Sequence, residues 1–219
     1  MQRFWAILAA TILMTGLAAA NDRSGSLPSP RDSRGGLEST RSAPRSLAAG
    51  AAVSVPIGWV GFCNLPENAE DCRVEPLAPR VAAMTAKAWK TVARINRNVN
   101  AAVAPVSDLD NYGVEERWTY PVNGRGDCED YVLLKRRLLI EAGFPRQALL
   151  VTVVRERNGE GHAVLTLATS EGDFVLDNKR DQIRLWREAG YAFVKRQSQE
   201  DPNLWVDLRA TGGEFVAAR

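Results

Sequence analysis

The residues with the clearest chemical potential are a cysteine, a histidine and an aspartate, in that order along the chain. Cys128 lies in the segment 126–131 (Gly-Asp-Cys-Glu-Asp-Tyr), His162 is the only histidine among 219 residues, and Asp177 ends the apolar run 174–177 (Phe-Val-Leu-Asp). A thiol, an imidazole and a carboxylate form the catalytic set of thiol enzymes. We therefore take Cys128 as a candidate nucleophile, His162 as its only available base and Asp177 as the acid that orients the base.

Cys128 stands at the predicted start of a helix, where a thiol is easily ionised. A thiol with an ordinary pKa of about 8.5 is mostly protonated at neutral pH, and both a helix N-terminus and a nearby imidazolium stabilise its anion. The first N–H groups of a helix also lack partners within the helix. We therefore expect the backbone N–H of Cys128 to help bind the oxyanion of a tetrahedral intermediate.

His162 opens one predicted strand, and Asp177 closes the next. The residues between these strands, Ser170-Glu171-Gly172, are typical of a turn, so the two strands are expected to form a hairpin. A pairing of His162 with Asp177 would centre the turn near residues 169–170, one position from the turn-forming residues. Since opposed residues point to the same face, we expect the carboxylate beside the imidazole, opposite it or nearly so.

Three acids around the cysteine pose an electrostatic problem. Asp127, Glu129 and Asp130 would raise the pKa of the thiol by like-charge repulsion. In one solution Asp127 is the helix N-cap and its side chain bonds a backbone N–H group. In another, the carboxylates bind a hard cation such as calcium. From these residues alone, capping is the favoured explanation.

Each of the three candidate residues also has an ordinary structural explanation. A lone cysteine in a helix is commonly a packed apolar residue. A lone histidine at a strand start is commonly packed or at the surface, and an aspartate before an asparagine is commonly part of a turn. The catalytic interpretation is favoured because the order of the residues, the helix start and the hairpin spacing agree.

The predicted secondary structure indicates an α+β fold that could position these residues. Val- and Leu-rich runs at 148–155, 162–168 and 173–177 predict an antiparallel meander, which two later runs, 191–196 and 204–208, could extend. Apolar spacings of three and four predict helices over 79–99 and 128–142. We expect helices packed on an antiparallel sheet, with residues 105–126 as an irregular loop leading to the cysteine.

The N-terminal region is typical of an exported protein. Arg3, the apolar stretch 4–17 and the alanines at 18–20 predict a signal peptide over residues 1–20, with an uncleaved anchor as the alternative. The Ser-, Pro- and Arg-rich segment 21–54 predicts a disordered arm, which leaves 55–219 as the folded domain. We therefore expect a periplasmic or secreted protein with no membrane span after signal cleavage.

The cysteine count and the charge add two further expectations. Cys63 and Cys72 enclose a short loop, so we expect them to form a disulfide and to leave Cys128 free. Metal binding by this pair is disfavoured because the chain has one histidine and no CxxC motif. The 28 basic and 26 acidic residues nearly balance, which gives no indication of a nucleic-acid or anionic membrane partner.

Three segments together resemble the bacterial transglutaminase-like cysteine peptidases, which include the LapG-like periplasmic proteases that release biofilm adhesins. They are 126–131 (Gly-Asp-Cys-Glu-Asp-Tyr), 161–165 (Gly-His-Ala-Val-Leu) and 175–178 (Val-Leu-Asp-Asn), and the resemblance covers about residues 56–208. It implies a papain/transglutaminase-like core in which Cys128, His162 and Asp177 match the nucleophile, the base and the orienting acid. It also implies a calcium (Ca2+) site, with Asp127 and Glu129 matching the acids that flank the cysteine.

The resemblance implies an exported cysteine endopeptidase, a thiol hydrolase that cleaves peptide bonds of a periplasmic or cell-surface protein, with a surface adhesin as one candidate. The residues do not identify a regulatory partner. The alternatives are a transglutaminase-like amide transferase or cell-wall peptide amidase, which share acyl-enzyme chemistry, a non-catalytic peptide-binding module, and a calcium-dependent structural protein.

Overall fold

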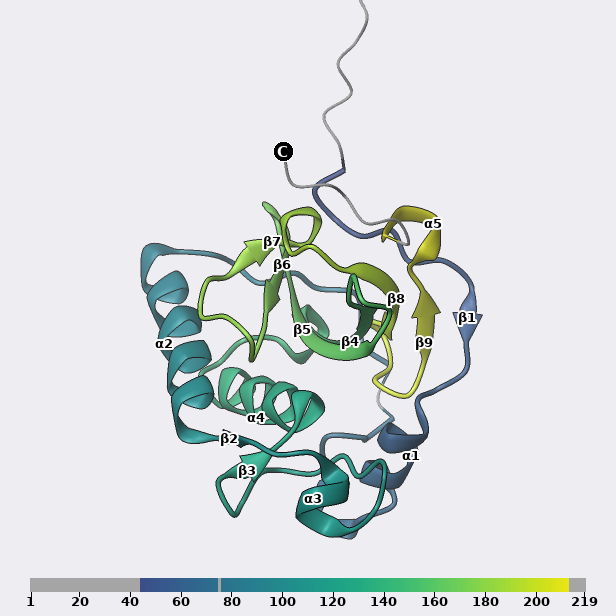
Figure 1. The fold of residues 1–219 in the computed structure, drawn as a ribbon. Helices are drawn as coiled ribbons and strands as arrows, with labels where there is room; N and C mark the ends of the chain where they lie inside the picture. The colour runs from purple at the N-terminus through teal and green to yellow at the C-terminus, as the bar shows by residue number, and fades with distance from the viewer. Residues whose placement is uncertain (1–43, 75, 213–219) are drawn as a thin grey trace, which may run out of the picture. The chain divides into compact units, whose positions relative to one another are not determined.

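The computed structural model describes residues 44–74 and 76–212, and its main element is a seven-stranded antiparallel sheet (Figure 1). The strand order is β1–β9–β8–β4–β5–β6–β7. A separate pair of short parallel strands, β2 and β3, lies outside this sheet. The strands are β1 (Ala52–Val53), β2 (Ala104–Pro105), β3 (Arg125–Gly126), β4 (Leu149–Arg155), β5 (Gly161–Thr169), β6 (Gly172–Leu176), β7 (Arg184–Leu185), β8 (Ala192–Gln197) and β9 (Trp205–Asp207).

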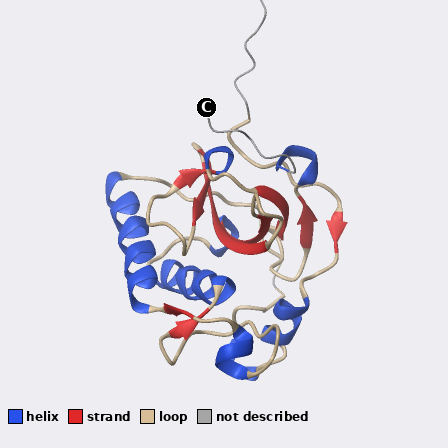
Figure 2. Cartoon of the chain, viewed as in Figure 1, coloured by secondary structure: helices blue, strands red, loops and turns tan. Residues whose placement is uncertain are grey.

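Two longer helices lie beside the sheet, as the blue ribbons of Figure 2 show. Helix α4 (Cys128–Glu141) packs against β4 and β5, and helix α2 (Ala86–Ala102) packs against α4. No helix among the described residues is long and apolar enough to span a membrane. The expected α+β class, with the cysteine at the start of a helix packed on an antiparallel sheet, is confirmed. The shorter helices are α1 (Ile57–Cys63), η1 (Pro66–Asn68), α3 (Asp108–Tyr112), η2 (Arg146–Ala148), η3 (Trp186–Glu188) and α5 (Arg209–Gly212).

The central strand β5 is buried on both faces, which explains why its sequence is apolar throughout. Leu165 and Leu167 face the core under α4, whereas Val164 faces a second cluster that contains Trp186 and Phe193. Continuous apolar runs are typical of strands covered on both sides. The strand therefore provides a rigid base for His162, its second residue.

The predicted boundary of the disordered arm at residue 54 is wrong, because residues 44–54 pack on the folded domain. Leu47 is 3% exposed, and β1 pairs with β9 and so covers an edge of the sheet. The backbone N–H of Asp173 donates to the Arg45 carbonyl at 3.0 Å. A single buried leucine and backbone pairing give little signal in a polar segment. The expected signal peptide and arm residues 21–43 lie outside the described residues.

The first long helix begins seven residues later than its apolar spacing predicts. In place of helix, Ala82 forms a parallel bridge with Thr169, its N–H donating to the Ala168 carbonyl at 2.8 Å. The helix starts after Thr85, whose side chain accepts a hydrogen bond from the Ala88 N–H as an N-cap. A tertiary strand contact and a good capping residue override the apolar periodicity here.

The predicted disulfide is present between Cys63 and Cys72, which closes the loop after α1. Cys128 is the free cysteine of the described chain. The expected irregular loop 105–126 contains more structure than predicted. It begins at β2, includes the short helix α3 capped by Ser107, and returns through β3 directly into α4.

Candidate active site

Cys128 is the first residue of α4, and its sulfur lies against the start of β5. The backbone N–H of Ala163, the residue after His162, donates a hydrogen bond to the thiol sulfur. The side chain of Cys128 is partly exposed, and its Sγ also lies 3.2 Å from Glu129 Oε2. The fold thus brings the predicted nucleophile beside the strand that carries the predicted base, across 34 residues of sequence.

His162 and Asp177 are in direct contact, with Nε2 of the imidazole 3.1 Å from Oδ1 of the carboxylate. The hairpin register pairs Leu165 with Leu176, so Asp177 falls opposite Val164 when the register is extended by one residue. His162 is therefore the diagonal neighbour of Asp177 on the same face, rather than its direct partner. The register differs from the expected one by two residues, and a shift by an even number leaves both side chains on the same face. The predicted side-by-side arrangement is therefore kept.

Asp177 is buried and held in place by a set of donors that the sequence did not reveal. Its Oδ2 accepts a hydrogen bond from the Tyr191 hydroxyl at 2.6 Å and lies 3.2 Å from Arg180 Nε. Its Oδ1 also accepts from the Lys179 N–H at 3.0 Å. Burial alone would raise the pKa of Asp177, but the hydrogen bonds from His162, Tyr191 and Lys179 lower it to about 2. The carboxylate is therefore ionised and oriented toward the imidazole at neutral pH.

The second ring nitrogen of His162 faces another acid. Glu156 Oε1 lies 3.9 Å from Nδ1, and Glu156 also forms an ion pair with Lys179. The Tyr191 ring packs against the imidazole at a centroid distance of 5.4 Å, with the two ring planes tilted by 52°. The imidazole is thus enclosed by a carboxylate on each nitrogen side and by one aromatic ring, and it is 5% exposed. Its position is fixed by Glu156, Asp177 and Tyr191, which come from three separate segments.

A second group of acids lies at the start of α4, with Asp108, Asp127 and Asp130 each offering an oxygen within 4.8 Å of the others. The parallel pairing of β2 with β3 brings residue 108 next to residue 127, whose Oδ2 accepts from the Asp108 N–H at 3.3 Å. The other oxygens hold the preceding loop. Asp108 accepts from the Arg117 N–H, and Asp130 accepts from the Thr119 N–H at 2.9 Å.

Each of these three acids keeps one buried oxygen without a hydrogen-bond partner among the described residues. The atoms are Asp108 Oδ1, Asp127 Oδ1 and Asp130 Oδ2. Burial and the mutual repulsion of the carboxylates raise the pKa of Asp108 to about 6 and that of Asp130 to about 8. Hard cations such as calcium prefer carboxylate oxygens. Three convergent, unpartnered carboxylate oxygens therefore fit a divalent cation.

One expectation about this region needs correction, and another stays a prediction. Asp127 is the N-cap residue of α4 by position, but its side chain makes no capping hydrogen bond, because its oxygens face Asp108 and the acid cluster. Glu129, expected beside Asp127 as a metal ligand, lies next to Asp127 and contacts the Cys128 thiol, but it is not among the three clustered acids; its role as a ligand stays a prediction. Sequence analysis missed Asp108 as a cluster member, because only the β2–β3 pairing brings it to Asp127.

The thiol lies in a strongly acidic environment. Burial and the adjacent Glu129 raise the pKa of Cys128 well above its ordinary value, and the Ala163 N–H opposes this effect. Burial and the nearby Asp127 likewise raise the pKa of Glu129. Burial, with the neighbouring acids as a second cause, therefore works against thiolate formation in the protein alone. Positive charge at the acid cluster would have the opposite effect.

Gly126, just before the cluster, is needed for space. A Cβ at this position would lie 2.7 Å from the Cβ of Asp130. The glycine therefore allows β3 to pass directly over the Asp130 side chain. Its absent side chain lets Asp127 and Asp130 approach each other at the helix start.

The antiparallel sheet with the free cysteine at the start of α4 is a transglutaminase-like α+β fold. The profile of the bacterial transglutaminase-like cysteine proteinases matches residues 49–212, so the chain belongs to that family. The family is one of cysteine peptidases, which confirms the expected enzyme class. No curated protein sequence is similar enough to the chain to count as a match.

Solved structures of LapG from Legionella pneumophila are similar to the chain. The calcium-bound structure is 22% identical, with a TM-score of 0.48, and the match covers 60% of this chain and 74% of that one. The EGTA-treated structure is 23% identical, with a TM-score of 0.47, and the match covers 58% of this chain and 72% of that one.

Proposed function

We propose that the protein is an exported cysteine endopeptidase whose catalytic residues are Cys128, His162 and Asp177. The observation that supports this most directly is the buried His162–Asp177 pair at 3.1 Å, next to a thiol that Ala163 holds at a helix start. A disulfide within the same domain fits an oxidising compartment, such as the periplasm or the cell exterior.

In the proposed reaction, His162 removes the proton of the Cys128 thiol, and the sulfur attacks the carbonyl carbon of a peptide bond. The unpaired N–H groups at the start of α4 donate to the resulting oxyanion. His162 then gives its proton to the nitrogen of the breaking bond, and the amine segment leaves. Asp177 keeps the imidazole in one orientation and stabilises its charged form. Water, activated by the same imidazole, releases the acyl segment.

The acid cluster of Asp108, Asp127 and Asp130 would hold a calcium ion. Such an ion would supply positive charge next to the acidic helix start and would link the loop at residues 117–119 to the first turn of α4. Glu129 has a different proposed role. It contacts the sulfur directly and so controls how readily Cys128 ionises.

The test combines three variants with an analysis of products. Wild-type protein, Cys128→Ala, His162→Ala and Asp177→Asn would be incubated with a denatured protein mixture in calcium, and newly formed amino termini would be labelled and identified. We expect new termini with the wild type, none with the first two variants, and at least about a hundredfold fewer with Asp177→Asn.

Circular dichroism of each variant serves as the control for folding. Undiminished cleavage by Cys128→Ala would exclude the mechanism. Addition of a primary amine separates hydrolysis from transfer. Amine incorporation in place of new termini would show that the protein is an amide transferase. A wild type that binds peptides and produces neither result would be a binding module.

A further inference from the structure

A pocket of about 460 Å3 lies next to the His162–Asp177 pair, and the proposed mechanism does not use it. Its walls come from the turn between β4 and β5, from the loop after β6, and from the start of β7 and the residues before β8. Its polar lining residues include Glu156, Arg157, Lys179, Arg180, Arg184 and Tyr191.

The pocket borders the imidazole through two of its own lining residues. Glu156 lies 3.9 Å from Nδ1 of His162, and the Tyr191 ring lies 5.4 Å from the imidazole ring. Tyr191 also bonds Asp177. A group that fills this pocket would therefore lie beside the base of the proposed reaction.

The charges of the pocket do not balance. Lys179 pairs with Glu156, Arg180 contacts Asp177, and the pocket acid Glu188 lies 3.9 Å from Arg187. Two arginines of the pocket have no carboxylate partner among the described residues. Arg184 donates to Gln182 at 2.7 and 3.1 Å, which leaves its charge uncompensated, and Arg157 has no carboxylate partner among residues 44–74 and 76–212.

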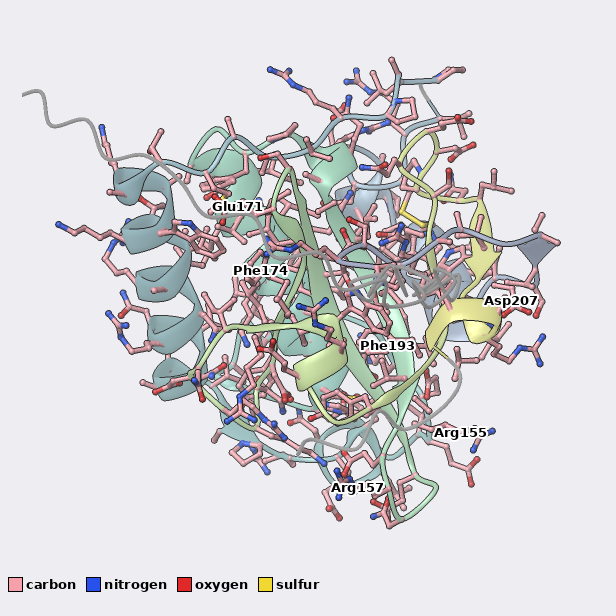
Figure 3. The ribbon with its side chains drawn as sticks, turned by 90° about the horizontal axis from the view of Figure 1, so that it is seen from above. Arg155, Arg157, Glu171, Phe174, Phe193 and Asp207 are labelled. Carbon is pink, nitrogen blue, oxygen red and sulfur yellow. A yellow bond between two sulfur atoms is a disulfide. The ribbon has the colours of Figure 1, made fainter. Side chains whose placement is uncertain are left out.

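The position of Arg157 also makes its guanidinium available to a group bound in the pocket. It lies in the turn after β4, and Figure 3 labels it together with Arg155 at the end of this hairpin. Arg184 reaches the pocket from the opposite side, at the start of β7. Two guanidinium groups that face one pocket suit a carboxylate, because each can donate two parallel hydrogen bonds to it.

We infer that this pocket binds an acidic side chain of the substrate, on the segment that leaves as the amine. This inference rests on the proposed function. The base must contact the nitrogen of the breaking bond, so the leaving segment passes the imidazole and reaches the pocket next to it. The enzyme would thus prefer Asp or Glu within the first few residues after the cleaved bond.

The experiment uses a synthetic library of random-sequence peptides in calcium and identifies the products. We expect Asp and Glu to be enriched about fivefold or more in the first three residues after the cut, consistent with a gain from one carboxylate–arginine pair. The double variant Arg157→Ala/Arg184→Ala should lose this enrichment. Its KM for an acidic peptide should rise about tenfold, while kcat changes little.

Arg155→Ala is the matched control, because Arg155 belongs to the same hairpin and bonds the Gly159 carbonyl outside the pocket lining. This variant should keep the acidic preference. The charge-reversed pair Arg157→Glu/Arg184→Glu should prefer Lys and Arg instead. An acidic preference that is equal in the wild type and the double alanine variant would overturn the inference, and so would cleavage without any acidic preference.

A binding measurement separates this inference from the proposed function. Immobilised Cys128→Ala would be loaded with the same library. Retention of acidic peptides that depends on Arg157 and Arg184, together with a wild type that cleaves nothing, would support the pocket and exclude the catalytic proposal. Absence of any arginine-dependent retention would overturn the pocket assignment whatever the catalytic result.

Discussion

The Tyr191 hydroxyl donates a 2.6 Å hydrogen bond to Oδ2 of Asp177, the carboxylate oxygen that His162 does not contact. His162 therefore holds one oxygen of Asp177, and Tyr191 holds the other. A carboxylate fixed in this way cannot rotate without breaking a bond at each oxygen. Tyr191 thus acts on the imidazole through Asp177, as a positioning residue.

Replacement of Tyr191 by Phe tests this role. The ring against His162 remains, but the bond to Asp177 is lost, and hydrogen bonds to charged groups contribute about 1.5–3 kcal/mol. We expect kcat to fall about tenfold with a small change in KM. Tyr120→Phe is the matched control, since its hydroxyl donates to Asp71 at 2.8 Å, away from the histidine. Equal losses of kcat in both variants would argue against positioning.

The acid cluster predicts a difference between two aspartates of α3. Asp108 is buried and contributes an unpartnered oxygen to the cluster, whereas Asp110 is exposed and bonds Ser107. Asp108→Asn should weaken calcium binding about tenfold or more, because it removes one charged ligand. Asp110→Asn should leave it nearly unchanged. Titration calorimetry and the rise of Tm with calcium measure this. Similar calcium affinity in both variants would exclude Asp108 as a ligand.

Reactivity of Cys128 toward iodoacetamide should depend on calcium. Burial and Glu129 hold the thiol pKa high, so in chelator we expect slow alkylation at about pH 7 that accelerates only in alkaline solution. Calcium should move this profile to lower pH and raise the rate at about pH 7 at least tenfold. The His162→Ala variant should lose the shift.

Glu129→Gln tests independently whether Glu129 contributes to the high pKa of the Cys128 thiol. Burial and Asp127 raise the pKa of Glu129 to about 9, so removal of its carboxyl should speed alkylation in chelator mainly above about pH 9, where that group is charged. Calcium affinity should stay nearly unchanged, because Glu129 is not among the three clustered acids. A pH profile that is the same in calcium and in chelator would show that the cluster does not influence the thiol.

Lys135 predicts a pH-dependent stability. It is fully buried on α4, and its Nζ has no hydrogen-bond partner among the described residues. Burial lowers its pKa to about 7, against the attraction of Asp177 and Asp181. Because the folded pKa is below the unfolded value, the unfolded chain binds more protons between about pH 7 and pH 10, and stability rises with pH in this window.

Lys135→Met should therefore be more stable than the wild type at about pH 7, by about 5 °C or more in Tm, since methionine removes a buried unpaired charge. The difference in Tm should shrink toward about pH 10, because there folding of the wild type no longer requires Lys135 to release a proton. Lys90→Met, at an exposed position of α2, is the control without this pH dependence. A constant difference across the range would contradict the lowered pKa.

The elements that sequence predicted best are those with strong local signals. The start of α4 at Cys128 followed from the apolar spacing over 128–142, and the β5–β6 hairpin followed from two apolar runs separated by Ser170-Glu171-Gly172. The contact between His162 and Asp177 depends only on this hairpin, so its approximate geometry could be anticipated. Its diagonal register could not, because turn residues alone do not fix the pairing to within two positions.

The parts that were missed depend on contacts between distant segments. Asp108 reaches Asp127 because two-residue strands pair in parallel, and strands this short give no periodicity to detect. Tyr191 directly precedes β8, a strand that pairs with neither β5 nor β6, and from there it contacts Asp177. Leu47 is likewise a single apolar residue in a polar segment that the folded domain buries. Such positions are decided by tertiary structure.

The close approach of Gly126 to Asp130 has a consequence for how this protein tolerates change. The glycine has no positive φ, so backbone conformation places no demand on it, and only the space taken by Asp130 does. Alanine at this position would push apart β3 and the first turn of α4, and with them the cluster and the thiol. Among variants selected for activity, substitution at position 126 should therefore survive only when a second change makes room at position 130.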